Sequence, residues 1–215
     1  GARSPAFSAF PMDADASKIA ARCGYPCVLK PLLLNGSRGV IRADNAAEFE
    51  SAWRRVCAIL RKSVGTHILV EDYIPGREVA VEALLGENGL RPLAIFDKPD
   101  PLEGPFFEET IYVTPSRLSA DEQEAVLAAT RESARALGLR TGPLHAELRL
   151  NAEGVWPIES AGRSIGGLCS RTLRFRSGVS LEELVLRQAT GLPIGSLAAE
   201  RGSRGVMMIP IPVRG

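Results

Sequence analysis

The chain has 215 residues, of which 45% are hydrophobic and 24% charged, so it can bury a sizeable core as one large domain or two small lobes. Its 26 basic and 25 acidic residues give a net charge of +1, and the basic residues are scattered along the chain. This balance argues against nucleic acid or an acidic membrane surface as a partner. No run of about 18 apolar residues occurs, so we expect no membrane-spanning helix.

The four cysteines form no Cys-x-x-Cys pair, and both histidines lie far from any pair of cysteines. We therefore expect reduced thiols in a cytoplasmic protein, and neither a zinc site nor a disulfide framework. The sequence starts at Gly1 without a methionine or a signal peptide, and its end, residues 205–215, resembles a strand halted within a domain. Both ends are interpreted as boundaries within a longer protein.

Hydrophobic periodicity and turn residues predict the elements in chain order. Three helix starts carry a capping residue three positions before a glutamate: Asn45, Ser119 and Ser180. The predicted helices cover residues 15–22, 45–60, 119–138 and 180–191, and the predicted strands cover residues 27–29, 40–41, 67–74, 77–85, 90–96, 144–150 and 155–159. Strands thus come in hairpins with helices between groups of them, which favours an α+β fold with mostly antiparallel sheets. A boundary near residue 75 would separate a small first lobe, residues 1–75, from a larger second lobe, residues 76–215.

Lys30 ends a buried predicted strand and is followed by the loop Asn35–Gly39. An ammonium group there could meet a phosphate, with backbone N–H groups of Gly36, Ser37 and Gly39 covering the remaining oxygens. The pattern is not a Walker P-loop, because no Gly-Lys-Ser/Thr follows the glycines. A lysine that extends from a strand end beside an ordinary hairpin loop explains the same residues.

The segment Val70–Glu78 joins two predicted strands through the turn Pro75-Gly76. A linker between lobes presents N–H and C=O groups that can bind the polar edge of adenine, and an acid just beyond it can accept hydrogen bonds from ribose hydroxyls. Two surface glutamates flanking a turn are the plain alternative.

Glu147 and Glu159 lie twelve residues apart on two strands joined by the turn 151–154. A hairpin of that length brings both carboxylates to one end of the sheet, where two hard oxygen donors suit Mg²⁺ that bridges nucleotide phosphates. Arg163 follows at the mouth of the loop 164–167 and could hold a transferring phosphoryl group. The alternative is a solvated acidic face, but a Leu-rich strand disfavours it because charged groups are costly to bury among apolar side chains.

These three clusters, in this order, resemble the ATP-grasp superfamily from Tyr25 to about Gly167. The segments that carry the resemblance are Gly24–Pro31, Val70–Ile74 with Glu78, and His145–Glu147 with Glu159–Arg163. Within the superfamily the chain is similar to carboxylate–amine ligases of the L-amino-acid ligase type, through the loop 97–109 and the ending Arg163-x-x-Gly166-Gly167. More distantly it resembles biotin carboxylases and carbamoyl phosphate synthases, although it lacks the His-Gln-Lys stretch of biotin carboxylases.

The resemblance implies an ATP-grasp fold of two lobes that clasp a nucleotide cleft, with the family's N-terminal domain missing from this chain. It also implies ATP and Mg²⁺ as cofactors, with Glu147 and Glu159 as the metal ligands and Arg163 steadying an acyl phosphate. The nucleotide-binding residues that it implies are Lys30 at the phosphates, Gly36, Ser37 and Gly39 in the covering loop, Glu71, Asp72, Tyr73 and Ile74 in the adenine hinge, and Glu78 at the ribose.

The function implied is activation of a small-molecule carboxylate as an acyl phosphate, which an amine attacks to form an amide. Ala161 stands where the family usually has an asparagine that ligates metal, which puts one magnesium site in doubt. Carboxylation through carboxyphosphate and a nucleotide-binding module without catalysis are the alternatives. Nucleic acid and membrane partners are not expected, and the sequence leaves a homodimer open.

Overall fold

The computed structural model describes residues 2–63, 65–176 and 178–209 and divides the chain into two compact units. Unit 1 comprises Gly1–Ser4, Gly76–Pro101 and Thr110–Gly215, and unit 2 comprises Pro5–Pro75 and Leu102–Glu109. The units differ from the expected lobes 1–75 and 76–215 in two segments, because residues 1–4 group with unit 1 and residues 102–109 with unit 2. Both units contain an antiparallel sheet and helices, so the α+β prediction is confirmed.

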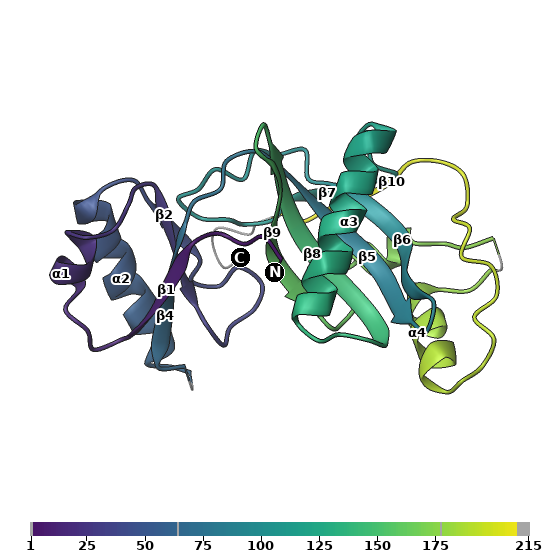
Figure 1. Ribbon diagram of the computed structural model, residues 1–215, viewed down its shortest axis with the longest axis horizontal. Coiled ribbons are helices and arrows are strands. Elements are labelled where there is room, and N and C mark those ends of the chain that lie inside the picture. Colours follow the sequence, from purple (N-terminus) through teal and green to yellow (C-terminus); the bar gives the residue numbers. More distant parts are fainter. Residues whose placement is uncertain (1, 64, 177, 210–215) are drawn as a thin grey trace. The chain divides into compact units, whose positions relative to one another are not determined.

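Unit 2 is built on a four-stranded antiparallel sheet with α1 and α2 on one side (Figure 1). The prediction missed its edge strand β1, which pairs with β4 along its full length. The strand order is β1 (Phe7–Pro11), β4 (His67–Asp72), β2 (Cys27–Pro31) and β3 (Ile41–Ala43), and the helices are α1 (Ala16–Ala20) and α2 (Ala46–Leu60).

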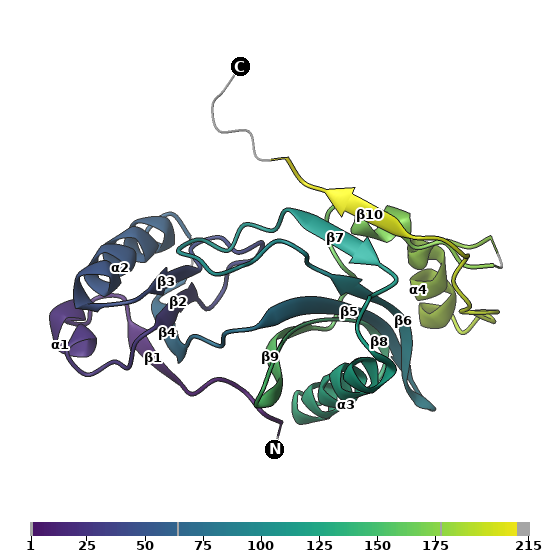
Figure 2. The same ribbon diagram turned by 90° about the horizontal axis from the view of Figure 1, so that it is seen from above.

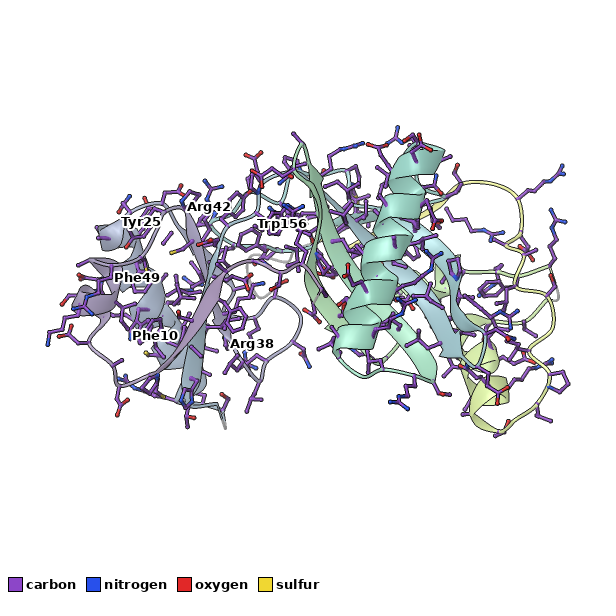
Figure 3. All side chains as sticks on the ribbon, in the orientation of Figure 1. Phe10, Tyr25, Arg38, Arg42, Phe49 and Trp156 are labelled. Atoms are coloured by element: carbon purple, nitrogen blue, oxygen red, sulfur yellow. The ribbon has the colours of Figure 1, made fainter. Side chains whose placement is uncertain are left out.

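The core of unit 2 lies between the sheet and α2. Phe49 stacks on Trp53 at 5.9 Å between ring centroids, and Phe10 meets Trp53 edge-on at 6.5 Å; Phe10 and Phe49 are labelled in Figure 3. Since side chains alternate along a strand, the core residues Cys27 and Leu29 of β2 place Val28 and Lys30 on the opposite face. The core of unit 2 therefore fixes the direction in which Lys30 leaves the sheet.

Unit 1 is built on a six-stranded antiparallel sheet with α3 on one face and α4 on the other (Figure 2). The prediction missed β7, and of the strand expected over residues 205–215 the structure shows β10, while residues 210–215 lie outside the described residues. The strand order is β10 (Arg204–Met207), β7 (Ile111–Thr114), β6 (Gly89–Asp97), β5 (Arg77–Gly86), β8 (Gly142–Asn151) and β9 (Gly154–Ala161); the helices are α3 (Ala120–Ala136), the 3₁₀ helix η1 (Cys169–Thr172) and α4 (Leu181–Ala189).

The two faces of β5 and β8 serve different purposes. Alternate residues of both strands, such as Val81 and Leu148, pack under α3 in one core. On the opposite face, Ala80 and Leu84 belong to a second core with Leu181 of α4. Each fully buried side chain of this size contributes about 1.5–3 kcal/mol, so both cores hold the register of the two strands.

None of the helices in the described part of the chain has the length and apolarity that crossing a membrane requires. The four cysteines are free thiols, three of them buried. Burial raises the pKa of Cys27 to about 12, so this thiol stays protonated at neutral pH.

Gly76 begins the second segment of unit 1 with φ 128°, and a Cβ atom there would overlap the backbone carbonyl oxygen of Leu150. We predict that Gly76→Ala lowers the free energy of unfolding by roughly 2–5 kcal/mol, the sum of backbone strain and displacement of β8. Thermal or urea unfolding measures this loss. Gly24→Ala is the control, because no atom lies within 4 Å of its added Cβ. Equal stability of the two variants would contradict the close approach at Gly76.

Candidate functional site

Lys30 lies at the end of β2 on the face of unit 2 that points away from the helices. It forms an ion pair with Glu71 of β4, and the two side chains are 19% and 10% exposed. The pair brings together two predicted nucleotide-binding residues, one from the phosphate cluster and one from the hinge. To bind a phosphate, Lys30 must either release Glu71 or divide its three N–H donors between the Glu71 carboxylate and the phosphate.

The loop after β2 has the backbone geometry of a tight, glycine-dependent turn. Gly36, Ser37 and Gly39 have φ angles of 60°, 53° and 83°, and the Val40 N–H donates to the Ser37 carbonyl at 3.1 Å. A Cβ at Gly39 would come within 2.8 Å of Pro31 Cγ, whereas nothing lies within 4 Å of one at Gly36. Gly36 is therefore required for its conformation and Gly39 also for space.

The predicted hinge, residues 71–74, belongs largely to the sheet of unit 2. Glu71 pairs with β1 on one side and β2 on the other, and the N–H groups of Asp72 and Tyr73 donate to the carbonyls of Ala6 and Pro26. These two N–H groups are thus occupied within the unit. The predicted strand over residues 67–74 is observed as β4, which ends at Asp72, and the assignment of residues 71–74 to the adenine site stays a prediction.

Tyr73 is held between a cation and a second aromatic ring. The Arg42 guanidinium lies 4.1 Å from the centre of its ring, and the Phe107 ring stacks on it at 6.4 Å. Phe107 comes from the segment 102–109, which is anchored on β3: the Arg42 N–H donates to the Pro105 carbonyl at 2.9 Å, and Phe106 bridges to Ile41. The aromatic segment therefore forms part of unit 2 beside the hinge.

In unit 1, a buried ionic network occupies the face of β5 and β8 opposite α3. Glu78 accepts from Lys98 Nζ on one oxygen and from Arg149 Nε on the other, each at 2.8 Å. Lys98 Nζ also lies 3.1 Å from Glu147 Oε1. The Lys98 side chain is 3% exposed, and those of Arg149 and Glu78 are 5% and 9% exposed. Both oxygens of Glu78, the predicted ribose acceptor, are thus already bonded to cations.

Glu147 and Glu159 face each other directly across β8 and β9. Directly opposed residues of an antiparallel pair project to the same side of the sheet, so the two carboxylates share one face. A β-bulge follows immediately, between Glu147 and Leu148. Their side chains are 16% and 55% exposed, so Glu147 is the buried member and Glu159 the accessible one.

Arg163 lies just past the end of β9. Its Nη2 is 3.6 Å from Glu159 Oε1, and its Nη1 donates to the Ser164 carbonyl at 3.0 Å. Both members of the ion pair are about half exposed, so the pair adds little to stability. Arg163 is consequently a cation next to the carboxylate pair that is not committed to holding the fold together.

The protein can supply only some of the ligands that Mg²⁺ needs. Within the residues that the structure describes, no cluster of three His, Cys, Asp or Glu side chains could hold a metal ion, and Ala161 lies opposite His145 without an oxygen donor in its side chain. Mg²⁺ typically uses one or two carboxylates and takes its other ligands from water and substrate phosphates. Glu147 and Glu159 meet that requirement.

His145 connects Glu147 to a second buried acid. Its Nδ1 lies 2.7 Å from Glu82 Oε1 and its Nε2 lies 3.3 Å from Glu147 Oε1. Burial alone would lower the pKa of His145, but the hydrogen bonds and charges of Glu147 and Glu82 raise it to about 9. Burial raises the pKa of Glu82, which the His145 hydrogen bond only partly offsets. The two acids therefore favour the protonated form of the imidazole.

Four of these polar residues were not among the predicted site residues: Glu82, Lys98, His145 and Arg149. The signal was present in the two-residue alternation, because Glu78 and Glu82 share one parity on β5 and His145, Glu147 and Arg149 share one on β8. Lys98 gives no such signal, since it follows the last residue of β6.

Comparison with known proteins identifies the family of this chain. D-alanine–D-alanine ligase of Aromatoleum aromaticum is 31% identical over 158 residues, which cover 72% of this chain and 48% of the relative. Alanine–anticapsin ligase of Bacillus subtilis is 27% identical over 184 residues, covering 76% of this chain and 38% of the relative. The chain thus spans about half the length, or less, of these curated relatives.

Solved structures with a similar fold support the same family. The crystal structure of an L-amino acid ligase from Bacillus licheniformis superposes with a TM-score of 0.82 at 30% identity, covering 98% of this chain and 52% of that one. A biotin carboxylase domain from Hydrogenobacter thermophilus shares the fold at a TM-score of 0.73 and 18% identity, covering 95% and 46%. The family model described as ATP-grasp domain matches residues 23–172, well over half of the chain. The chain therefore belongs to the ATP-grasp family.

Proposed function

We propose that the protein is an ATP- and Mg²⁺-dependent ligase that joins a small carboxylic acid to an amine. The observation that carries this proposal is the opposed pair Glu147 and Glu159 with Arg163 beside it, 3.6 Å from Glu159. Relatives named as D-alanine–D-alanine, alanine–anticapsin and L-amino acid ligases support an amino acid as the carboxylate and a second amino acid as the amine.

The reaction proceeds in two displacements. An oxygen of the substrate carboxylate attacks the γ-phosphorus of ATP, the bond to the β-phosphate oxygen breaks, and ADP leaves. The amine then attacks the acyl carbon, phosphate departs, and the amine loses a proton to give the amide. No side chain of the chain acts as a nucleophile, so positioning and neutralisation of charge account for the rate.

The positions of the charged side chains support the following residue roles. Lys30 and the loop Gly36–Gly39 bind the nucleotide phosphates, and the segment Glu71–Ile74 contributes to the adenine site through groups not already used within unit 2. Glu147 and Glu159 would hold Mg²⁺, which would supply positive charge to neutralise the phosphates. Arg163 binds the acyl phosphate. Glu78 acts at the ribose with the lone pairs that Lys98 and Arg149 leave.

Phosphate release by the protein at its full natural length tests the proposal, with amino acids supplied singly and in pairs and the product identified by mass spectrometry. We expect release that depends on ATP, Mg²⁺ and both substrates. Release that depends on bicarbonate without an amine would instead indicate carboxyphosphate chemistry. Tight nucleotide binding with no release under any combination would indicate a binding module, which the alanine at position 161 favours. A cytoplasmic location and a homodimeric assembly stay predictions.

We predict that Lys30→Met weakens binding of an ATP analogue with Mg²⁺ by about ten- to a hundredfold in isothermal titration. A charge-assisted hydrogen bond is worth about 1.5–3 kcal/mol, and each 1.4 kcal/mol is tenfold. Lys18→Met and Lys62→Met are controls, because both side chains are exposed and Lys18 pairs with Asp15 at 3.2 Å.

The ion pair with Glu71 supplies a sharper test of this role. Lys30→Met leaves the Glu71 carboxylate uncompensated, which would itself repel phosphate. The double variant Lys30→Met/Glu71→Gln removes that charge. If Lys30 contacts phosphate, the affinity stays low in the double variant. Recovery of wild-type affinity would show that Lys30 merely neutralises Glu71.

Arg163→Lys should lower kcat by roughly 10²–10³ while the ATP dissociation constant changes little. A guanidinium can bind two oxygens of an acyl phosphate, whereas an ammonium offers a point charge. Losing a donor that acts in the transition state costs about 2.7–4 kcal/mol. Steady-state kinetics and titration measure the two quantities, with Arg140→Lys at an exposed position as the control. Weakened ATP binding with normal turnover would place Arg163 on the nucleotide instead.

A further inference from the structure

Glu82 lies at the centre of β5, with none of its surface exposed to solvent. It stands directly opposite His145 of β8, on the face that also carries Glu78 and Glu147. Its strand neighbours on that face are Ala80 and Leu84, both part of an apolar core. A carboxylate in such a place is costly to bury unless it is paired.

Among the described residues, the side chain that bonds to Glu82 is the imidazole of His145, which also contacts Glu147. His145 Nδ1 lies 2.7 Å from Glu82 Oε1, and its Nε2 lies 3.3 Å from Glu147 Oε1. Lys98 Nζ approaches the same Glu147 oxygen at 3.1 Å. Two side chains that contact one oxygen, His145 and Lys98, restrict rotation of the Glu147 carboxyl group, and Glu82 sets the direction of the His145 ring.

Glu82 is not an efficient device for stability alone. Its second oxygen, Oε2, is buried and meets no donor at hydrogen-bond geometry among the described residues, although the Ile165 backbone N–H lies close enough to lower the pKa of the carboxyl group. Replacing a buried ion pair with apolar side chains of similar volume is often neutral or stabilising. The arrangement is therefore better explained by what it does to His145 and, through it, to Glu147.

We propose that Glu82 is a positioning residue: by fixing the imidazole of His145, it holds the Glu147 carboxylate in the orientation that receives the divalent cation. This inference rests on the proposed role of Glu147 as a metal ligand. Partners of this kind, one step removed from the metal, orient its ligands, and their loss typically costs about 10- to 100-fold in metal affinity or activity.

The test is the affinity of Mn²⁺ for the full-length protein with a non-hydrolysable ATP analogue, measured by electron paramagnetic resonance. We expect Glu82→Leu to weaken Mn²⁺ binding by about 10- to 100-fold and Glu82→Gln to weaken it less, because the Gln carbonyl can still accept from His145. Affinity for the analogue in the presence of EDTA should not change. Thr130→Val is the matched control, since Thr130 is fully buried on α3 and its hydroxyl donates to the Val126 carbonyl of the same helix at 2.8 Å.

A double-mutant cycle tests the route through His145. In a His145→Gln background, Glu82→Leu should change Mn²⁺ affinity less than about twofold, because the element that transmits its effect is already lost. An undiminished loss in that background would overturn the proposal. Wild-type Mn²⁺ affinity in both Glu82 variants would also overturn it. If Glu82→Leu does not fold, Glu82→Gln decides the question: a smaller but measurable loss supports the proposal, and wild-type affinity overturns it.

Glu147→Gln separates this inference from the proposed function. If Glu147→Gln weakens Mn²⁺ binding and the Glu82 variants do not, only the positioning role fails. If Glu147→Gln has no effect, the metal site itself is wrong and the positioning role falls with it.

Discussion

The strict two-residue alternation of β5 and β8 is the constraint on which the larger unit depends. One parity, including Val81 and Leu148, is buried under α3. The other parity places Glu78, Glu147 and Arg149 together on the opposite face. A register slip of one residue would move charges into the α3 core and apolar side chains onto the ionic face. The register that buries the α3 core therefore also brings these charged residues together.

The ionic face tolerates burial because charge is balanced over short distances. Glu78 lies between Lys98 and Arg149, and Lys98 also reaches Glu147. Removing one partner of such a network leaves an uncompensated buried charge, which typically costs about 3–5 kcal/mol. Exposure rises from Lys98 at 3% to Glu159 at 55%. The charged side chains thus range from fully buried, at Lys98, to solvent-accessible, at Glu159. This range suits a site that must be preorganised and still admit a ligand.

Local signals in the sequence predicted most helices and hairpins, because their causes are local. Ser119 and Glu122 form the expected capping box, and the spacing from Glu147 to Glu159 gave the observed pairing. The strand β1 was missed because its partner β4 lies some sixty residues away and its own residues are mostly exposed. Lys98 and Glu82 were missed for a related reason: their importance arises from contacts across strands that distance along the chain does not reveal.

The most direct test of the central claim, activation of a carboxylate as an acyl phosphate, is the fate of a carboxylate oxygen. The full-length protein would be incubated with ATP, Mg²⁺, an amine and an amino acid that carries ¹⁸O at both oxygens of its carboxylate. Mass spectrometry should then find one ¹⁸O atom in each phosphate released, because the oxygen that attacks the γ-phosphorus leaves with it. Label in AMP, or an amide product accompanied by unlabelled phosphate, would contradict the account.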